Sequence, residues 1–142
     1  IIHPVIGIES WNVSLGIGSF ITLEFGAALP PSKQGIIRGE WHLWIRHCVW
    51  RIENENDVIA ASEDDREELQ NKVKILNGIS ITHFYIEKPS LETTIIFSNL
   101  IRLKLFPIYS SNKKKYPHWV MFTPLGKVLI IGPGTTWSYK AE

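Results

Sequence analysis

Most of the chain alternates apolar and polar residues, a pattern that predicts β-strands. The segment GSFITLEF at residues 18–25 has this period of two, which is typical of a strand with one buried face. Further segments of this kind, each bounded by turn residues, lie at 79–87, 92–97, 101–106, 119–123 and 127–131. Because the connections between them are short, neighbouring strands are expected to pair antiparallel, as in a meander.

One segment, residues 62–76, has a helical pattern. Ser62 is a suitable N-cap, and Asp65 occupies the position three residues later that completes a variant capping box. Acidic residues fill the first turns, where the helix dipole favours negative charge, and Asn77-Gly78 provides a stop. The stripe expected to face the core consists of Leu69, Val73 and Leu76. The sequence therefore predicts an α+β protein, a mainly antiparallel β-sheet (meander) with one substantial helix at about 62–76.

The segment WHLWIRHCVW at residues 41–50 lies within a strand predicted at about 36–52, with a bend near Gly39. Its apolar residues fall on both faces of that strand, and such a strand is usually covered on both sides. We therefore predict a central strand. Three residues of one face are predicted to be core residues without a catalytic role: Trp44, Cys48 and Trp50. The alternative is an exposed tryptophan, such as Trp41, that anchors an interface.

The same segment holds the residues that could carry chemistry. On a single strand, His42 and Cys48 point to one face, about 20 Å apart at ~3.3 Å per residue, and His47 points to the other. Zinc needs ligand atoms within about 2.3 Å, so these three residues cannot share one metal ion. Cys48 has no well-placed base and is predicted to be a small buried residue. The segment GPGTTW at 132–137 lacks the ending of a phosphate-binding loop and predicts a turn. We therefore expect no enzyme activity, no cofactor and no metal.

Length and composition limit the class of protein. With 142 residues, 44% of them hydrophobic and 20% charged, the chain is expected to form a single globular domain over residues 1–142. No apolar run reaches the roughly 18 residues that indicate a membrane span, and a single cysteine cannot form an internal disulfide. The first residues show neither a signal-peptide pattern nor an initiator Met, so we expect a cytoplasmic protein with some residues upstream.

The net charge of +1 conceals an uneven distribution of charge along the chain. Eight of the 14 acidic residues lie in one stretch: Glu53, Glu55, Asp57, Glu63, Asp64, Asp65, Glu67 and Glu68. Basic residues follow later in the chain: Arg102, Lys104, Lys113, Lys114 and Lys115. One part of the surface is therefore expected to be negative and another positive. The helix dipole accounts for the acids at 63–68 but not for those at 53–57.

Three segments carry a family resemblance: GEWHLWIRHCVWRIE at 39–53, HWVMFTPLGKVLIIGPG at 118–134 and TTW at 135–137. The second segment combines a strand that contains tryptophan, a Pro-x-Gly turn and another strand. Together with the acidic cluster, these segments are similar to bacterial immunity proteins encoded beside contact-dependent growth inhibition or polymorphic toxins. Such families share no functional residues, because each member is adapted to its own toxin.

The resemblance implies a cytoplasmic immunity protein that binds one cognate toxin C-terminal domain and neutralises it by covering its active site. Many such toxins are nucleases with positive clefts, so the expected partner is a basic nuclease domain, with a ribonuclease favoured. Carboxylates can imitate the phosphates of a nuclease substrate. The residues expected to bind the partner are Glu53, Glu55, Asp57, Glu63, Asp64 and Asp65. Neither a membrane nor direct nucleic-acid binding is expected. The alternative is a small ligand- or nucleic-acid-binding β-domain that uses the lysines at 113–115.

Overall fold

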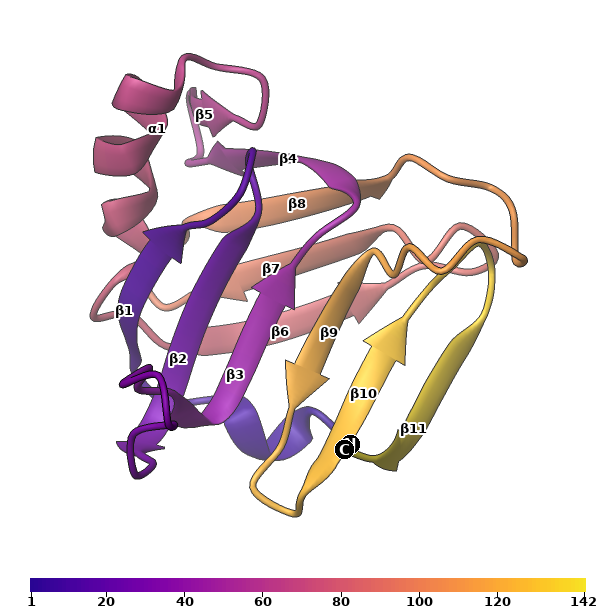
Figure 1. The fold of residues 1–142 in the computed structure, drawn as a ribbon. Helices are drawn as coiled ribbons and strands as arrows, with labels where there is room; N and C mark the ends of the chain where they lie inside the picture. The colour runs from indigo at the N-terminus through magenta and orange to yellow at the C-terminus, as the bar shows by residue number, and fades with distance from the viewer.

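The computed structural model describes residues 1–142, which form two antiparallel β-sheets and one helix (Figure 1). The six-stranded sheet contains, in spatial order, β1 (Ser10–Leu15), β2 (Ile21–Ala28), β3 (Gly39–Ile45), β9 (Trp119–Phe122), β10 (Lys127–Ile131) and β11 (Trp137–Ala141). The five-stranded sheet contains β5 (Val58–Ala61), β4 (Cys48–Glu53), β8 (Arg102–Pro107), β7 (Thr93–Phe97) and β6 (Ile81–Ile86). All neighbouring strands are antiparallel, which confirms the α+β, mainly antiparallel prediction.

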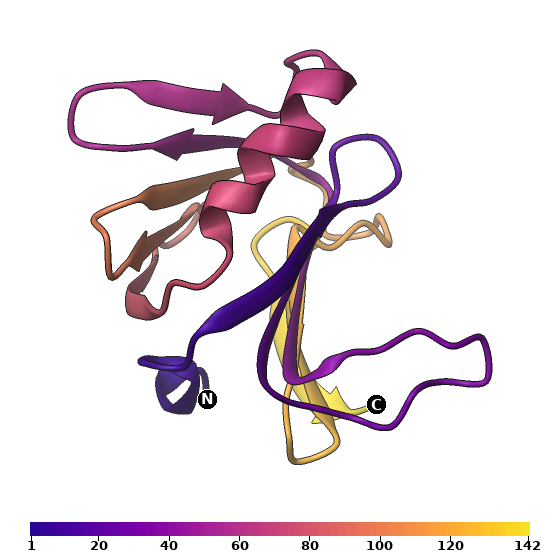
Figure 2. The same cartoon turned by 90° about the vertical axis from the view of Figure 1, so that its left-hand side faces the viewer.

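The helix begins later than the sequence predicts. It comprises α1 (Arg66–Lys72) and a 3-10 turn, η2 (Val73–Leu76), and it lies beside β1 and β5 at the edge of the two layers (Figure 2). The predicted capping role of Ser62 is wrong, because its hydroxyl accepts a hydrogen bond from the Trp50 amide at 3.2 Å and so extends the pairing of β4 with β5. The predicted stripe is confirmed, since Leu69, Val73 and Leu76 are all buried.

The strand predicted at about 36–52 is in fact two strands in different sheets. β3 ends at Ile45 and β4 begins at Cys48, so Arg46 and His47 form a corner between the layers. In β3 the odd-numbered residues face the core, whereas in β4 the even-numbered residues do so. The two-residue corner therefore reverses the parity of the chain. The buried apolar residues of segment 41–50 therefore do not lie on two faces of one strand. They lie on the inner faces of two strands, β3 and β4, which border the same core.

Of the three residues predicted to be core, two are buried as predicted and one, Trp44, is not. Cys48 and Trp50 are buried in β4, as predicted. Trp44 lies on β3, where the even-numbered residues point away from the core. Its side chain is only half-buried, on the outer face of the six-stranded sheet. Trp41, the residue considered as an exposed anchor, is buried.

The chain crosses between the two sheets at one place, the neck, where Arg46 and His47 lie beside Pro117 and His118. All strands of the five-stranded sheet come from the part of the chain between β3 and β9, and these two strands pair directly with each other. The chain leaves the six-stranded sheet at Arg46 and returns to it at His118. There, the Arg46 amide donates to the His118 carbonyl at 3.0 Å and the His47 amide donates to the Pro117 carbonyl at 3.2 Å. The five-stranded sheet is thus an insertion between β3 and β9, and backbone hydrogen bonds join the two ends of this insertion.

Three strands, β1, β5 and β11, have no counterpart in the sequence prediction. The pairing of β1 shifts register between Trp11 and Ser14, and Asn12 has a positive φ of 48°, so its alternation is interrupted. β5 has only four residues, and β11 (WSYKA) is largely polar. Short, irregular or polar strands at sheet edges lack the period-two signal on which the prediction relied.

The core lies between the layers and contains 26 buried apolar residues. Two completely buried tryptophans tie the layers together through their indole N–H groups. Trp50 on β4 donates to the Ser19 carbonyl at 2.7 Å, and Trp119 on β9 donates to the Thr93 hydroxyl of β7 at 3.0 Å. None of the helical segments is long and apolar enough to cross a membrane.

Candidate functional site

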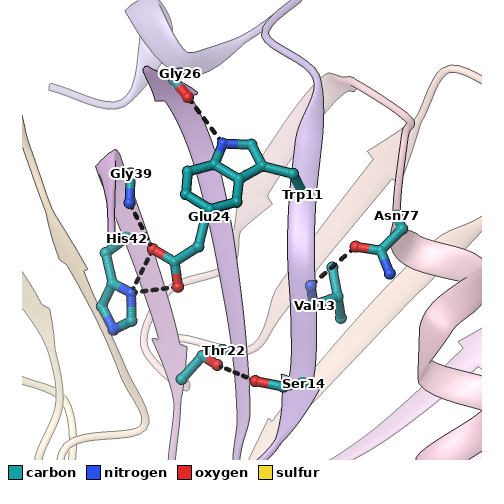
Figure 3. Close-up of polar contacts among 9 residues, drawn as sticks. All are labelled: Trp11, Val13, Ser14, Thr22, Glu24, Gly26, Gly39, His42 and Asn77. Carbon is teal, nitrogen blue, oxygen red and sulfur yellow. Dashed lines mark hydrogen bonds and ion pairs between the residues drawn. The ribbon is translucent and has the colours of Figure 1, made fainter. Parts of the chain in front are cut away.

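The outer face of the six-stranded sheet carries a buried, hydrogen-bonded His–Glu pair that the sequence did not reveal (Figure 3). His42 Nδ1 lies 2.8 and 2.7 Å from the two carboxylate oxygens of Glu24, and both side chains are almost completely buried. The Gly39 amide also donates to Glu24 at 2.9 Å. A Cβ at Gly39 would lie 2.5 Å from the Phe25 carbonyl, so the backbones approach closely there. The hydrogen bonds of Glu24 to His42 and Gly39 therefore hold an irregular part of the β2–β3 pairing in place.

Trp11, on the neighbouring strand β1, lies next to the Glu24–His42 pair. Its side chain lies beside Glu24, and its indole N–H donates to the Gly26 carbonyl at 2.8 Å (Figure 3). In the sequence, Glu24 reads only as the polar side of a strand, and its partner His42 is 18 residues away. No local pattern joins the two residues, so only the strand pairing identifies them.

Glu53, the first of the predicted partner-binding acids, lies within a cluster of cations. Its carboxylate is 3.1 Å from Arg51 Nε, 3.6 Å from an Arg102 nitrogen and 3.5 Å from Lys104 Nζ. Glu53 is buried, and each of its three partners is half-buried on β4 or β8. Its charge is therefore more than balanced by three cations of the protein itself, and Glu53 offers no free negative charge to a partner.

The other predicted acids lie at the two ends of β5. Glu55 and Asp57 are exposed in the β4–β5 turn, which Asn54 holds by accepting hydrogen bonds from two backbone amides. Glu63 and Asp65 are exposed between β5 and α1. We define the acidic edge as the exposed carboxylates along β5 and the start of α1: Glu55, Asp57, Glu63, Asp65, Glu67 and Glu68.

Two features modify the acidic edge. Asp64 is half-buried, and its carboxylate accepts a hydrogen bond from the Ala61 amide at 2.9 Å, so it shapes the turn before α1. Val58 lies between the two acidic groups and is 58% exposed. The structure thus brings four predicted acids to one edge of the five-stranded sheet, separated by the length of β5, and leaves Glu53 and Asp64 in structural contacts.

A second charged surface is a groove with a volume of about 630 Å³ beside β10 and β11. We define it as the cationic groove by its five basic residues: Arg46, Lys113, Lys114, Lys115 and Lys140. No carboxylate lines it. The run at 113–115 is visible in the sequence, whereas Arg46 and Lys140 join it only because β3, β9, β10 and β11 are neighbours in one sheet.

Arg46 occupies a fixed position at the groove. Its guanidinium carbon lies 4.3 Å from the centre of the Trp44 ring, a cation–π arrangement. Partial burial lowers the pKa of Arg46, which means that its charge is desolvated without a carboxylate to compensate. Burial, followed by the charges of Arg46 and His118, also lowers the pKa of the neighbouring His47. The imidazole of His47 is therefore neutral at pH 7.

The turn between β10 and β11 supports one wall of the groove. This turn is the GPGTTW segment, which is closed by a hydrogen bond from the Gly132 amide to the Thr136 carbonyl at 2.8 Å. Asn112 in the lysine loop accepts a hydrogen bond from the Thr135 amide at 2.9 Å. The buried His118 ring packs against Gly132, where a Cβ would lie 2.9 Å from the His118 amide nitrogen. These contacts fix the lysine run relative to β11.

The residues considered for catalysis or metal binding are not arranged for either. Burial raises the pKa of the Cys48 thiol to about 12, so almost no thiolate forms at pH 7. No three His, Cys, Asp or Glu side chains lie together where they could hold a metal ion. His42 and Cys48 belong to different sheets.

Comparisons with protein-family models, with curated proteins and with solved structures found no match for this chain.

Proposed function

We propose that this chain is an immunity protein that binds a cognate toxin domain and neutralises it by covering its active site. The observation that supports this most is the acidic edge, where exposed carboxylates gather on one side of β5 and α1. Lys72 pairs with Glu68 at 3.5 Å, and no ion pair engages the other carboxylates of this edge. The resemblance of the sequence to toxin-linked immunity proteins gives the same role.

Exposed carboxylates suit a partner that is a nuclease, and a ribonuclease is the favoured kind. An enzyme that binds phosphates presents a positive cleft, and an array of carboxylates can occupy that cleft in place of the substrate. Opposite charges also steer the two proteins together and raise the association rate. The net charge of +1 does not by itself favour this role, so the proposal depends on the local gathering of carboxylates at the acidic edge.

The proposed interface differs from the six acids expected from sequence. Glu53 is moved out of it, because its carboxylate is already paired with three cations. Asp64 is assigned to shaping the turn. Val58 is added as an apolar contact between the charged groups, since interfaces usually combine a desolvated apolar centre with a polar rim.

An immunity protein should be encoded beside a large secreted protein, and the C-terminal domain of that neighbour is the candidate toxin to test. Cells that produce this domain should stop growing, and co-production of the chain should restore growth. In stopped-flow binding, the double change Glu55→Lys/Asp57→Lys should slow association about tenfold or more at low salt. The effect should shrink as ionic strength rises, because the surface charges are screened.

A matched control reverses two exposed acids outside the acidic edge, Glu87→Lys/Glu142→Lys. It changes the net charge equally and should slow association much less. Equal slowing by both double variants would show that only overall charge matters. Unchanged association in the Glu55/Asp57 variant, or failure of the chain to restore growth, would remove the proposal.

A further inference from the structure

The cationic groove has no role in the proposed toxin contact, which lies on the other sheet. Its lining combines five basic side chains with backbone and hydroxyl groups of the β10–β11 turn and contains no acid. Surface lysines are usually accompanied by carboxylates that balance their charge. A concave site with uncompensated cations concentrates positive potential and attracts anions.

Arg46 is held at the groove by contacts of both its backbone and its side chain. Its backbone is fixed in the neck between the sheets, and its guanidinium rests on the Trp44 ring at 4.3 Å. The Nε atom of Arg46 is buried and has no hydrogen-bond partner in the chain. Arg46 lines the groove, and no carboxylate lies there to neutralise its charge, so its guanidinium is a suitable partner for phosphate.

Exposed aromatic rings accompany the cations. Trp137 lines the groove and is 53% exposed. At the end of the lysine run, Tyr116 is 41% exposed, and its ring centre lies 4.9 Å from that of Tyr109 and 4.8 Å from that of His47. Flat rings beside a basic track are the arrangement that binds single-stranded nucleic acid, since phosphates follow the cations and bases stack on the rings.

We propose that the cationic groove binds single-stranded nucleic acid, with its phosphates on Arg46 and the lysines and a base stacked on Trp137. An acidic peptide would use the lysines but leave the rings without a partner. A membrane surface is flat, whereas this site is a groove. The first expectation from sequence was no direct nucleic-acid contact, whereas the alternative interpretation was a β-domain that binds a ligand or nucleic acid through the lysines at 113–115; the proposal takes up that alternative. It is independent of the acidic edge, so either proposal can fail alone.

Binding is measured by fluorescence anisotropy with labelled 12-residue oligouridine and oligodeoxythymidine. Wild type should bind at low salt, with affinity falling as salt rises by about 0.7 log units per tenfold salt for each phosphate contact. Lys114→Ala/Lys115→Ala should lower affinity at least tenfold and reduce that slope. The matched control, Lys33→Ala/Lys74→Ala, removes two exposed lysines elsewhere and should leave both quantities nearly unchanged. Circular dichroism spectra of all variants should match wild type.

Stacking is tested separately from charge. Trp137→Ala should lower affinity about fivefold or more with an unchanged salt slope, and Trp137→Phe should retain most of the affinity. Polyglutamate and vesicles with anionic lipids serve as competitors. The proposal is overturned if polyglutamate competes as well as the oligonucleotide, if only the vesicles bind, or if the lysine control loses as much affinity as the groove variant. No effect of Trp137→Ala would also overturn it.

Discussion

Replacing Trp50 by alanine removes one of two tryptophans that are completely buried between the sheets. The change leaves a cavity at the centre of the core, and truncation of a buried tryptophan typically costs about 3–5 kcal/mol. The Ser19 carbonyl, which accepts the indole N–H at 2.7 Å, also loses its donor, for about 1 kcal/mol more. The expected loss is therefore about 4–6 kcal/mol, a large part of the roughly 5–15 kcal/mol of a typical domain.

The measurement is urea and thermal unfolding, followed by far-ultraviolet circular dichroism. A loss of this size should lower Tm by roughly 10–20 °C for a chain of this length. Trp50→Phe keeps an aromatic ring but loses the N–H, so its loss should be clearly smaller. The control is Trp137→Ala, which removes a half-exposed ring at a sheet edge and should destabilise the fold clearly less than Trp50→Ala.

Two outcomes would contradict this reasoning. If Trp50→Ala kept its Tm but no longer bound its partner, Trp50 would be an interface anchor and its burial between the sheets would be wrong. If Trp50→Ala and Trp137→Ala lowered Tm equally, the contrast between a buried and an exposed tryptophan would not govern stability here.

Three further predictions concern a charge, a turn and the thiol. Glu53→Gln should destabilise the fold by about 1–3 kcal/mol in urea unfolding, because the cations around it lose their counter-charge; no change would mean that these pairs are fully screened. Gly132→Ala should cost about 2 kcal/mol or more, because a Cβ meets His118 at a φ of 92°, and it should exceed Gly126→Ala, where the φ is 68° but the space is open. Cys48 should react with a thiol reagent at pH 8 only on unfolding. Since its pKa is raised from 9.0 to about 12 in the folded state, stability should fall as pH rises across that window. Rapid labelling of the native protein would contradict the buried thiol.

Local patterns predicted those parts of the fold that depend on neighbouring residues. The period of two placed β2, β6, β7, β8, β9 and β10, and the helical spacing placed Leu69, Val73 and Leu76 on one buried face. The same reasoning failed at Arg46 and His47, where the chain changes sheets. Nothing in the spacing distinguishes one strand covered on both faces from two strands of opposite parity.

Pairing between strands that are distant in sequence determines which residues meet in most of the candidate sites. Glu53 looked like a free acid because its partners Arg102 and Lys104 lie on β8, about 50 residues later in the chain. Arg46 and Lys140 reach the same groove only through the order of strands in the six-stranded sheet. By contrast, Glu55 and Asp57 are exposed for a local reason, the tight turn at Asn54, and the sequence placed them correctly in a loop.

The neck at Arg46 and His118 also determines the order in which the protein can fold during synthesis. β3 emerges from the ribosome long before its neighbour β9, because the whole five-stranded sheet is translated between them. Until β9 arrives, the edge of β3 has no strand to pair with, and an unpaired edge favours aggregation. Completion of the larger sheet must then wait for contacts between distant parts of the chain, which makes folding slow. The exposed edge of β3 is therefore expected to favour aggregation most while residues 46–118 are being added.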